Sequence, residues 1–583
     1  KVKGRKIIVK YYRRTGNLWF GLSLLVTLYY GVWFYYFVFS QEYIVQDDVR
    51  QHVVWLQRFI DPELFTDDII AEYFSGLATW GFKTLYFLAA KLGVEPILLA
   101  KILPPVLAFI ATIYLYLFTL EIFPVPMAGF ISSLLGNQLM WLNDDLTSAT
   151  ARAFLCPLFA AFLYYLARGS IIPCLILMLL QGWFYPHVLL IEVAILSLRL
   201  LTFKGKLPLN FSSKKQPYIW LIAGLIIAAI ALYPITQKPP ELATSVTAEQ
   251  MRQMPEFDLG GRTPFFGVGW LNFWFSGSSG LSLPLFPTIV WSGLALPWLF
   301  KSNSPLVKLI TSKIAIIYQT ILASLLMFTL AHLMLPTLHL PSRFTYHTLR
   351  FILAITAAIA LTIAIDFLIN WIARKRQLKQ PFNLFDKIKL SLITLAGITV
   401  VVFPAIPPVF TWFQGWYPGL NPTVYQHLAQ QPKDTLVASL STEADNIPAY
   451  SQRSILIAGE FAYAYHLFYH DQIKQRAIAL LKAQYSPELS VLQSFIQQYG
   501  VDYILVDHDA FDPDYFTEKD WLIHSSWTTE TERAIAQIIS NDIPALKQLI
   551  PACSVVSNQN LDLVESSCIL ESYRLVQKAN KSQ

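Results

Sequence analysis

The chain has 583 residues, of which 55% are hydrophobic and only 14% are charged. This composition excludes an ordinary water-soluble protein and indicates many apolar membrane spans. The net charge of +6 does not indicate nucleic-acid binding, because the positive charges stand in short clusters between apolar segments, where they set the orientation of a membrane protein. We therefore expect no nucleic-acid partner.

Apolar runs predict about eleven membrane-spanning helices. The first, over 18–39, is too long for the core of a signal peptide and has no small-residue cleavage site, so we expect it to be retained. The others are expected near 97–121, 126–142, 148–167, 171–185, 187–203, 218–235, 283–300, 314–335, 349–372 and 388–410. The fifth and sixth form one long stretch that we divide at Pro186, because proline breaks a helix.

The basic residues predict the orientation of these spans. With the N-terminus in the cytoplasm, every strongly basic short loop falls on the cytoplasmic face, as the positive-inside rule requires. These loops lie within 204–215, 301–313 and 373–379. The outer face then carries a first loop over 41–93, the turn at Asn143, a further loop over 237–281 and everything after Phe410.

The sequence changes character near residue 415. Alternating apolar residues predict strands over 435–441, 454–459 and 501–507, and amphipathic stretches predict helices over 471–485 and 487–500. We therefore expect a polytopic α-helical membrane protein with its N-terminus inside. A transmembrane module over 1–415 precedes an extracytoplasmic α/β domain over 416–583.

The four cysteines fit this placement. Cys553 and Cys568 lie in the external tail and flank a strand-turn-strand pattern. An oxidising compartment permits them to pair, so we predict a structural disulfide. Cys156 and Cys174 fall in spans, where a free thiol packs as a small apolar group.

A first acidic pair, Asp47 and Asp48, follows the first span in the sequence QDDVRQHVVWLQRF. Apolar residues three and four positions apart predict an amphipathic helix that begins here. In one interpretation Asp47 only caps this helix. In the other, two carboxylates at the outer mouth of a bundle, with Arg50 and His52 nearby, act as a general base or hold a divalent ion against a phosphate.

A second acidic pair, Asp144 and Asp145, stands between the third and fourth spans. Either residue is suited to cap the fourth helix. Arg152 follows about two turns later, where an unpaired guanidinium would be costly in a membrane. Two interpretations stay open: a local Asp–Arg ion pair, or an arginine that faces a cavity and receives an anionic headgroup.

Two further segments carry polar residues at the outer face. The segment LPSRFTYHTLR supplies Arg343 and Arg350, and arginine binds phosphate through two hydrogen bonds and stays charged. The alternative is that Arg343 reaches ordinary phospholipid headgroups. His187, at the start of the sixth span, is either a hydrogen-bonded core residue or part of a site.

The sequence lacks the signatures of soluble enzymes: it has no Walker loop, no HExxH and no GxSxG. An active site on the outer face would also lack cytosolic nucleotide sugars and ATP. The energy for a group transfer would then have to arrive on a lipid.

This arrangement resembles the glycosyltransferase C superfamily of polytopic enzymes. DDVRQHV looks like the acidic motif of the family's first external loop, and NDDLTSATARAF is similar to a second acidic motif found in some members. The similarity covers the first seven spans best. It implies transfer of a sugar from a polyprenyl-phosphate donor to an acceptor hydroxyl on the outer face of a bacterial plasma (inner) membrane.

The resemblance also implies roles for the residues above. Asp47 would be the general base, and Asp48 would support it or bind the acceptor. Asp144 and Asp145 would hold a divalent metal ion, Mg²⁺ or Mn²⁺. Donor phosphate would be bound by Arg152, Arg343 and Arg350, and the acceptor by Arg50, His52 and His187. GWYP at Gly415 departs from the WWDYG motif of oligosaccharyltransferases, so transfer to asparagine sequons is disfavoured and the acceptor stays open.

Two other classes of protein compete with this interpretation. A transporter would favour internal repeats and ionisable groups near the bilayer centre, whereas here the acids cluster at the outer rim and we find no repeat. A non-catalytic scaffold with an external binding domain is the third class. Replacement of Asp47 by Asn, with sugar transfer and transport as readouts, discriminates among the three.

Overall fold

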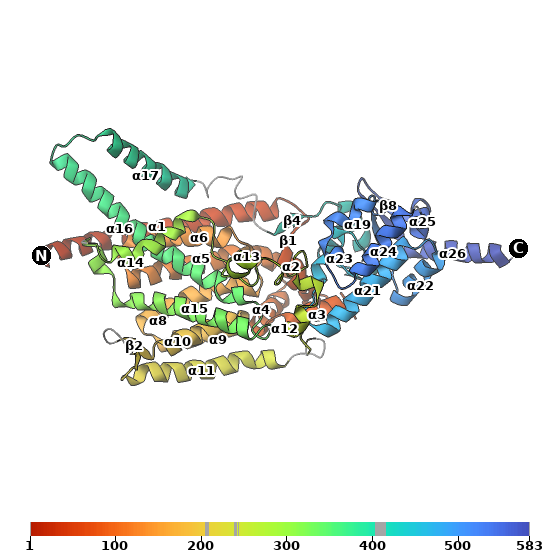
Figure 1. Cartoon of the computed structure of the whole chain (residues 1–583), viewed down its shortest axis with the longest axis horizontal. Helices are drawn as coiled ribbons and strands as arrows, with labels where there is room; N and C mark the ends of the chain where they lie inside the picture. Colours follow the sequence, from red (N-terminus) through yellow and green to blue (C-terminus); the bar gives the residue numbers. More distant parts are fainter. Residues whose placement is uncertain are drawn as a thin grey trace.

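In the computed structural model, the apolar helices lie side by side in a long bundle, and the C-terminal region is stacked on one end of it (Figure 1). The structure describes residues 2–203, 209–237, 242, 244–302, 304–402, 415–540 and 542–581. Helix α1 starts at the far end of the bundle, and helix α26 lies at the opposite end of the molecule.

Among the residues that the structure describes, six helical segments are long and apolar enough to cross a membrane. They are Thr15–Phe39 within α1 (Val2–Phe39), α5 (Pro96–Ile122), Ala151–Arg168 formed by η2 (Ala151–Phe154) and α8 (Leu155–Arg168), α11 (Lys215–Thr236), Ser312–Leu333 formed by η7 (Ser312–Ile314) and α15 (Ala315–Leu333), and Pro341–Gln377 formed by η8 (Pro341–Phe344) and α16 (Tyr346–Gln377). Each coincides with a predicted span.

The other five predicted spans also correspond to helices. These are α6 (Pro126–Trp141), α9 (Ile171–Phe184), α10 (Pro186–Leu198), η5 (Thr288–Ala295) with α14 (Leu296–Leu299), and α17 (Leu384–Val402). The break between α9 and α10 comes directly before Pro186, where the sequence predicts it. The end of the predicted eleventh span, 403–410, lies outside the described residues. The number of crossings stays a prediction.

Polar side chains join three of these helices inside the bundle. The hydroxyls of Thr27 on α1 and Thr112 on α5 are 2.9 Å apart, and the Asn137 amide on α6 donates to the Thr112 hydroxyl over 2.9 Å. Because lipid tails are as apolar as leucine, hydrogen bonds between helices and close packing hold such bundles together. The core of the bundle therefore includes a buried polar contact.

The two ends of the bundle differ in charge. The start of α1, the hairpin of β2 (Leu201–Phe203) and β3 (Leu209–Phe211), and the basic end of α16 lie at the end away from the C-terminal region (Figure 1). The acidic pairs lie at the other end, beside the C-terminal region. This arrangement agrees with the alternation predicted from the basic loops, and the assignment of one end to the cytoplasm stays a prediction.

The first outer segment folds onto the acidic end of the bundle. It contains β1 (Ile44–Gln46), α2 (Asp47–His52), η1 (Val54–Phe59), α3 (Ile69–Leu77) and α4 (Trp80–Lys91). Strand β1 pairs with β4 (Trp416–Pro418), and the Asp47 amide donates to the Gly415 carbonyl over 2.7 Å. The φ angle of Gly415 is +76°, which favours glycine.

Both predicted helix caps are wrong. The N-cap of α2 is Gln46, whose Oε1 accepts the Val49 amide over 3.3 Å, and Asp47 is the first helical residue. The fourth helix, α8, begins at Leu155, well after the second acidic pair, because the intervening residues form a short turn of helix, α7 (Asp144–Thr147), and then η2. The carboxylates are thereby left free for other contacts.

The C-terminal region is built on a five-stranded sheet with the order β6-β5-β7-β9-β8. The strands are β5 (Leu436–Ser439), β6 (Ser454–Ile455), β7 (Tyr503–Asp507), β8 (Ser554–Ser557) and β9 (Leu561–Glu565). Strands β5, β6 and β7 run parallel, and β9 is antiparallel to β7. The predicted strands are β5, β6 and β7. The two predicted helices are α21 (Leu467–Tyr485) and α22 (Leu489–Tyr499), which lie in the connection between β5 and β7.

Several helices of the C-terminal region flank this sheet. The main ones are α19 (Pro422–Ala429), α20 (Ile447–Ser451), α24 (Thr528–Ile539), α25 (Ala545–Cys553) and α26 (Ser566–Lys581). Cys553 at the end of α25 and Cys568 on α26 form the predicted disulfide, with their Cα atoms 5.5 Å apart. The bond fixes the start of α26 beside β8 and β9.

Candidate active site

A cavity of about 950 Å³ opens at the acidic end of the bundle. Its walls come from α2, α3 and α4, from the residues around Arg152, from the junction of α9 and α10, from the loop before α16, and from residues 463–466 of the C-terminal region. The cavity therefore lies where the bundle meets the C-terminal region. Its lining is rich in arginine, histidine and tyrosine.

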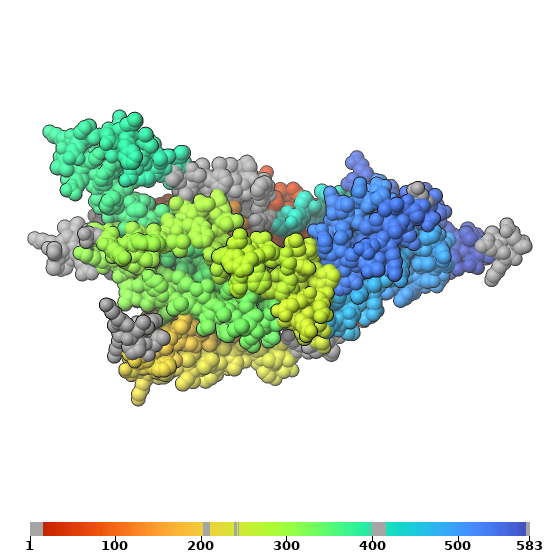
Figure 2. Space-filling model, viewed as in Figure 1, coloured from red at the N-terminus to blue at the C-terminus, as the bar shows by residue number. Residues whose placement is uncertain are grey.

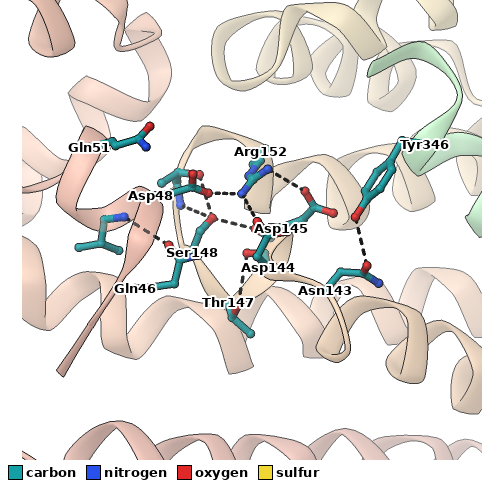
Figure 3. Close-up of polar contacts among 12 residues, drawn as sticks. Gln46, Asp48, Gln51, Asn143, Asp144, Asp145, Thr147, Ser148, Arg152 and Tyr346 are labelled. Carbon is teal, nitrogen blue, oxygen red and sulfur yellow. Dashed lines mark hydrogen bonds and ion pairs between the residues drawn. The ribbon is translucent and has the colours of Figure 1, made fainter. Parts of the chain in front are cut away.

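Asp48 is the member of the first acidic pair that lines this cavity. It lies on the first turn of α2, and its carboxylate forms an ion pair with Arg152 (Figure 3). Burial raises the pKa of Asp48 to about 6, although the nearby Arg152 guanidinium acts in the opposite direction. A carboxylate with such a pKa is a stronger base than an exposed aspartate and is still ionised at neutral pH.

Arg152 binds three carboxylates at once. Besides Asp48, its Nη2 contacts Asp144 Oδ2 at 2.7 Å, and its Nη1 lies 3.3 Å from Asp145 Oδ1 (Figure 3). The side chain of Arg152 is only 16% exposed. The local ion pair that the sequence allows is thus present, and Asp48 from the first acidic pair joins it from 104 residues away.

Arg343 is a second guanidinium in the cavity wall. It lies on η8, directly before α16. Within the described parts of the chain, no carboxylate oxygen lies within 4 Å of Arg343, whereas Arg152 has three such partners. Arg343 interacts with the Tyr185 side chain, which is neutral, so its remaining donors and its positive charge are available for an anion in the cavity.

Asp47, which the sequence analysis predicts to be the general base, does not line the cavity. Its carboxylate forms an ion pair with Arg50, whose Nη1 donates to Asn446 Oδ1 over 2.7 Å. Both residues therefore face the junction with η10 (Thr442–Asn446) of the C-terminal region. Arg50, predicted to bind the acceptor, likewise lies outside the cavity.

The junction around Asp47 contains more buried charges. Burial raises the pKa of Asp445 to about 6 against the attraction of Arg50, and burial also raises the pKa of Glu460 well above its ordinary value. The Glu460 carboxylate pairs with Arg262 at 2.5 Å. Arg262 belongs to the outer loop after α11, so this ion pair fastens that loop to the C-terminal region.

That outer loop, which contains α12 (Ala248–Met251), η4 (Pro255–Phe257) and α13 (Trp270–Phe275), packs against the C-terminal region (Figure 2). The Glu256 carboxylate accepts the Ser526 amide over 2.6 Å and lies 2.9 Å from His470 Nε2. The pKa of Glu256 is lowered: burial alone would raise it, but these hydrogen bonds favour the ionised form. The loop therefore has two separate polar attachments.

The predicted histidines line the cavity, but Arg350 does not. His52 and His187 both contribute to the wall. Burial and the neighbouring arginines lower the pKa of His52 to about 4, so it is neutral at physiological pH. Arg350 donates to Asn143 Oδ1 over 2.8 Å and lies 3.4 Å from the centre of the Tyr346 ring, which turns it away from the cavity predicted to hold the phosphate.

The second acidic pair is not arranged around an open metal position. Carboxylate oxygens are the ligands that Mg²⁺ and Mn²⁺ prefer. Here, however, Asp144 and Asp145 both turn toward Arg152, whose guanidinium lies between them and Asp48. Among the residues that the structure describes, no group of three or more His, Cys, Asp or Glu side chains is placed to hold a metal ion.

The C-terminal region also contributes to the cavity, which the sequence did not predict. Tyr463, Tyr465 and His466 line it. The Tyr463 hydroxyl donates to Gln51 Oε1 over 3.0 Å, which joins this segment to the helix that carries Asp48. The aromatic run FAYAYHLFYH over 461–470 is the signal in the sequence, but nothing in it shows that these rings face the bundle.

A search of solved structures finds proteins with a similar fold. The chain is similar to the archaeal oligosaccharyltransferase AglB from Archaeoglobus fulgidus, solved in complex with an inhibitory peptide and a dolichol-phosphate. The identity is 11%, the match covers 87% of this chain and 72% of that chain, and the TM-score is 0.50. At this identity the likeness shows a shared fold. This fold agrees with the fold expected from the sequence resemblance.

A weaker likeness is found to the arabinofuranosyltransferase AftD from Mycobacteria, at 13% identity over 86% of this chain and 36% of that chain. Its TM-score of 0.44 is too low to carry an argument. No protein-family model matches the sequence, and no curated protein matches it.

Proposed function

We propose that the protein is a membrane glycosyltransferase that moves a sugar from a polyprenyl-phosphate donor to an acceptor hydroxyl. The observation that carries this proposal is found in one cavity at the end of an apolar bundle. A buried carboxylate there stands beside a guanidinium that has no carboxylate partner in the described parts of the chain. Asp48 supplies the base, and Arg343 supplies the site for the donor phosphate. The shared fold with AglB supports the same class of reaction.

The proposed chemistry is a single displacement at the anomeric carbon. The acceptor hydroxyl oxygen attacks this carbon and forms the new glycosidic bond, while its proton passes to the Asp48 carboxylate. The bond from the anomeric carbon to the phosphate oxygen breaks, its electron pair stays on that oxygen, and polyprenyl phosphate leaves. The anomeric configuration is inverted.

In this proposal the base is Asp48, whereas the sequence alone favours Asp47. The reason is position: Asp48 lines the cavity, and Asp47 is bound to Arg50 at the junction with the C-terminal region. Arg343 and Arg152 stabilise the negative charge that develops on the leaving phosphate. His52, which is neutral, and His187 are hydrogen-bonding groups of the wall beside the acceptor. Arg350 holds Asn143 in place.

Two further points belong to the same proposal. The cavity faces the outside of the plasma (inner) membrane, because the basic loops lie at the opposite end of the bundle. The C-terminal domain begins near residue 416 and covers the cavity with the segment that contains Tyr463. The donor enters from the membrane, and an acceptor of unspecified class, whether a glycan, a lipid or a protein, enters from the aqueous side.

The test uses the full chain purified into lipid nanodiscs. A panel of polyprenyl-phosphate sugars is supplied, and release of polyprenyl phosphate is measured with and without soluble acceptors. We expect turnover with at least one donor, a loss of about 10²- to 10⁴-fold in Asp48→Asn, and a much smaller loss in the matched variant Asp47→Asn. A folded wild-type protein that moves donor lipid across vesicles without cleaving it would instead support a transporter.

A further inference from the structure

The cluster around Arg152 has the composition of a divalent-cation site but contains a different cation. Three carboxylates, from Asp48, Asp144 and Asp145, surround one place at the wall of the cavity, although no three such side chains among the described residues are positioned to hold a metal ion as they stand. Hard oxygen ligands in this number are typical of Mg²⁺ and Mn²⁺ sites. In this protein the guanidinium of Arg152 lies at that point and contacts all three.

Arg152 occupies the place where a metal ion would contact the three carboxylates. Its side chain is 16% exposed, and those of Asp48, Asp145 and Asp144 are 19%, 12% and 35% exposed, so three of the four side chains are mostly buried. A divalent ion that contacts the same three carboxylates would have to lie against the guanidinium. In a poorly solvated site, like charges at such a distance repel strongly.

We propose that Arg152 is a tethered cation that takes the position of a divalent metal ion, so that the acidic cluster works without bound metal. The part of this inference that concerns catalysis rests on the proposed function, because both concern the same site. The statement about metal binding does not depend on it.

The chemistry of arginine suits this role. Its guanidinium is always charged and carries five donors in a fixed plane, so one side chain serves several oxygens at once. It also brings a single positive charge instead of two. A direct metal ligand would be held in its ionised form and would be a poor proton acceptor, whereas burial raises the pKa of Asp48 to about 6 despite Arg152.

Three further basic residues lie around the cluster. His347 Nδ1 lies 3.5 Å from Asp145 Oδ2, and Arg350 is held next to it by Asn143. Among the described residues, Arg343 has no carboxylate oxygen within 4 Å, so its charge stays available on the cavity side while Arg152 binds the three carboxylates.

The experiment measures metal binding directly. Mn²⁺ is titrated into the purified, chelator-treated protein in nanodiscs of neutral lipid, and free Mn²⁺ is followed by electron paramagnetic resonance. We expect no Mn²⁺ bound to the cluster in the wild type. In Arg152→Gln, which removes the charge but keeps most of the volume, we expect one Mn²⁺ per protein, and the double variant Arg152→Gln/Asp144→Asn should lose it.

The outcomes separate cleanly. Mn²⁺ binding by the wild type that disappears in Asp144→Asn overturns the inference. Absence of binding in both the wild type and a folded Arg152→Gln overturns it as well, because the cluster is then no cation site. If Arg152→Gln does not fold, the same Mn²⁺ titration is carried out on Arg152→Ala, and its result is compared with the wild type in the same way.

The activity assay adds an independent arm. Turnover by the wild type that persists in a chelator supports the inference, and turnover that requires added Mg²⁺ or Mn²⁺ overturns it when Asp144→Asn also abolishes Mn²⁺ binding. A complete lack of turnover with every donor bears on the proposed function only, since the Mn²⁺ titration needs no substrate.

Discussion

Helix α2 presents neighbouring carboxylates to two different environments. On one side, Asp48 faces the cavity together with Arg152 and Arg343. On the other, Asp47 faces the junction with the C-terminal region, where Arg50 and Arg262 neutralise Asp47 and Glu460. Both environments are buried clusters of acids and arginines, and of the two only the first lines the cavity.

The contrast shows what distinguishes a candidate site from a structural ion-pair network. At the junction, each of the two arginines has a carboxylate partner within the protein. At the cavity, Arg343 has none among the described residues, so it can hold a ligand. Perturbed carboxylate pKa values occur on both sides and do not discriminate between them, because burial is the main cause in each.

The strongest test of this contrast replaces each of the two aspartates by asparagine in turn. Asp48→Asn should lower kcat by about 10²- to 10⁴-fold, since a general base contributes that much. Asp47→Asn should change kcat by less than about tenfold, because it removes only a structural ion pair. Initial rates of polyprenyl phosphate release measure both. The opposite ranking would return the catalytic role to Asp47.

Arg343 should matter for donor affinity. Arg343→Gln removes a charged donor from the cavity wall, and a hydrogen bond to a charged group contributes about 1.5–3 kcal/mol, so the Kd for the donor should rise by about one to two orders of magnitude. Isothermal titration with a polyprenyl phosphate measures this. The matched variant Arg350→Gln should leave the Kd nearly unchanged, and equal losses in both would contradict the separation of their roles.

A substitution at the junction should lower the stability of the protein more than its activity. Glu460→Gln leaves Arg262 without its buried partner, and because the Arg262 side chain is 30% exposed, we expect a loss of about 1–3 kcal/mol, below the range for fully buried pairs. Thermal unfolding and protease cleavage between the outer loop and the C-terminal region measure the effect. A variant with normal stability and no turnover would move catalysis to the junction.

Activity and stability should depend on pH in opposite directions through Asp48. The base must be ionised, so turnover should rise as the pH passes through about 6. Its folded pKa lies above its unfolded value of 3.8, so the folded state binds more protons between these values. The stability from this group is therefore fully present below about pH 4 and lost as the pH rises through 6.

The change in Tm on replacing Asp48 by Asn isolates this contribution. It should shift in favour of the variant as the pH is raised from 4 to 7. A difference in Tm that is constant with pH would contradict the raised pKa of Asp48.

The smallest expected effect concerns the link between the C-terminal region and α2. Tyr463→Phe removes the hydroxyl that donates to Gln51, and a neutral hydrogen bond contributes about 1 kcal/mol, so kcat/KM should fall by about fivefold. Tyr465→Phe, on the same segment, is the matched control. An effect as large as that of Asp48→Asn would make Tyr463 a catalytic residue.

The sequence determined the features that depend on local composition. Apolar length predicted the helices of the bundle, Pro186 predicted the break between α9 and α10, and alternation predicted β5, β6 and β7. The spacing of Cys553 and Cys568 around a strand pair predicted their disulfide. These features follow from the hydrophobic effect, backbone chemistry and short-range geometry, which a single chain displays directly.

Only the tertiary structure decided how the charges are used. Asp47 and Asp48 are adjacent in sequence, and the turn of a helix points them to different sides, so no pattern ranks one above the other. Arg152 meets Asp48 across 104 residues, and Gln51 meets Tyr463 across 412. The charge balance of a buried cluster depends on every group that packing brings to it, and that set is fixed only when the chain has folded.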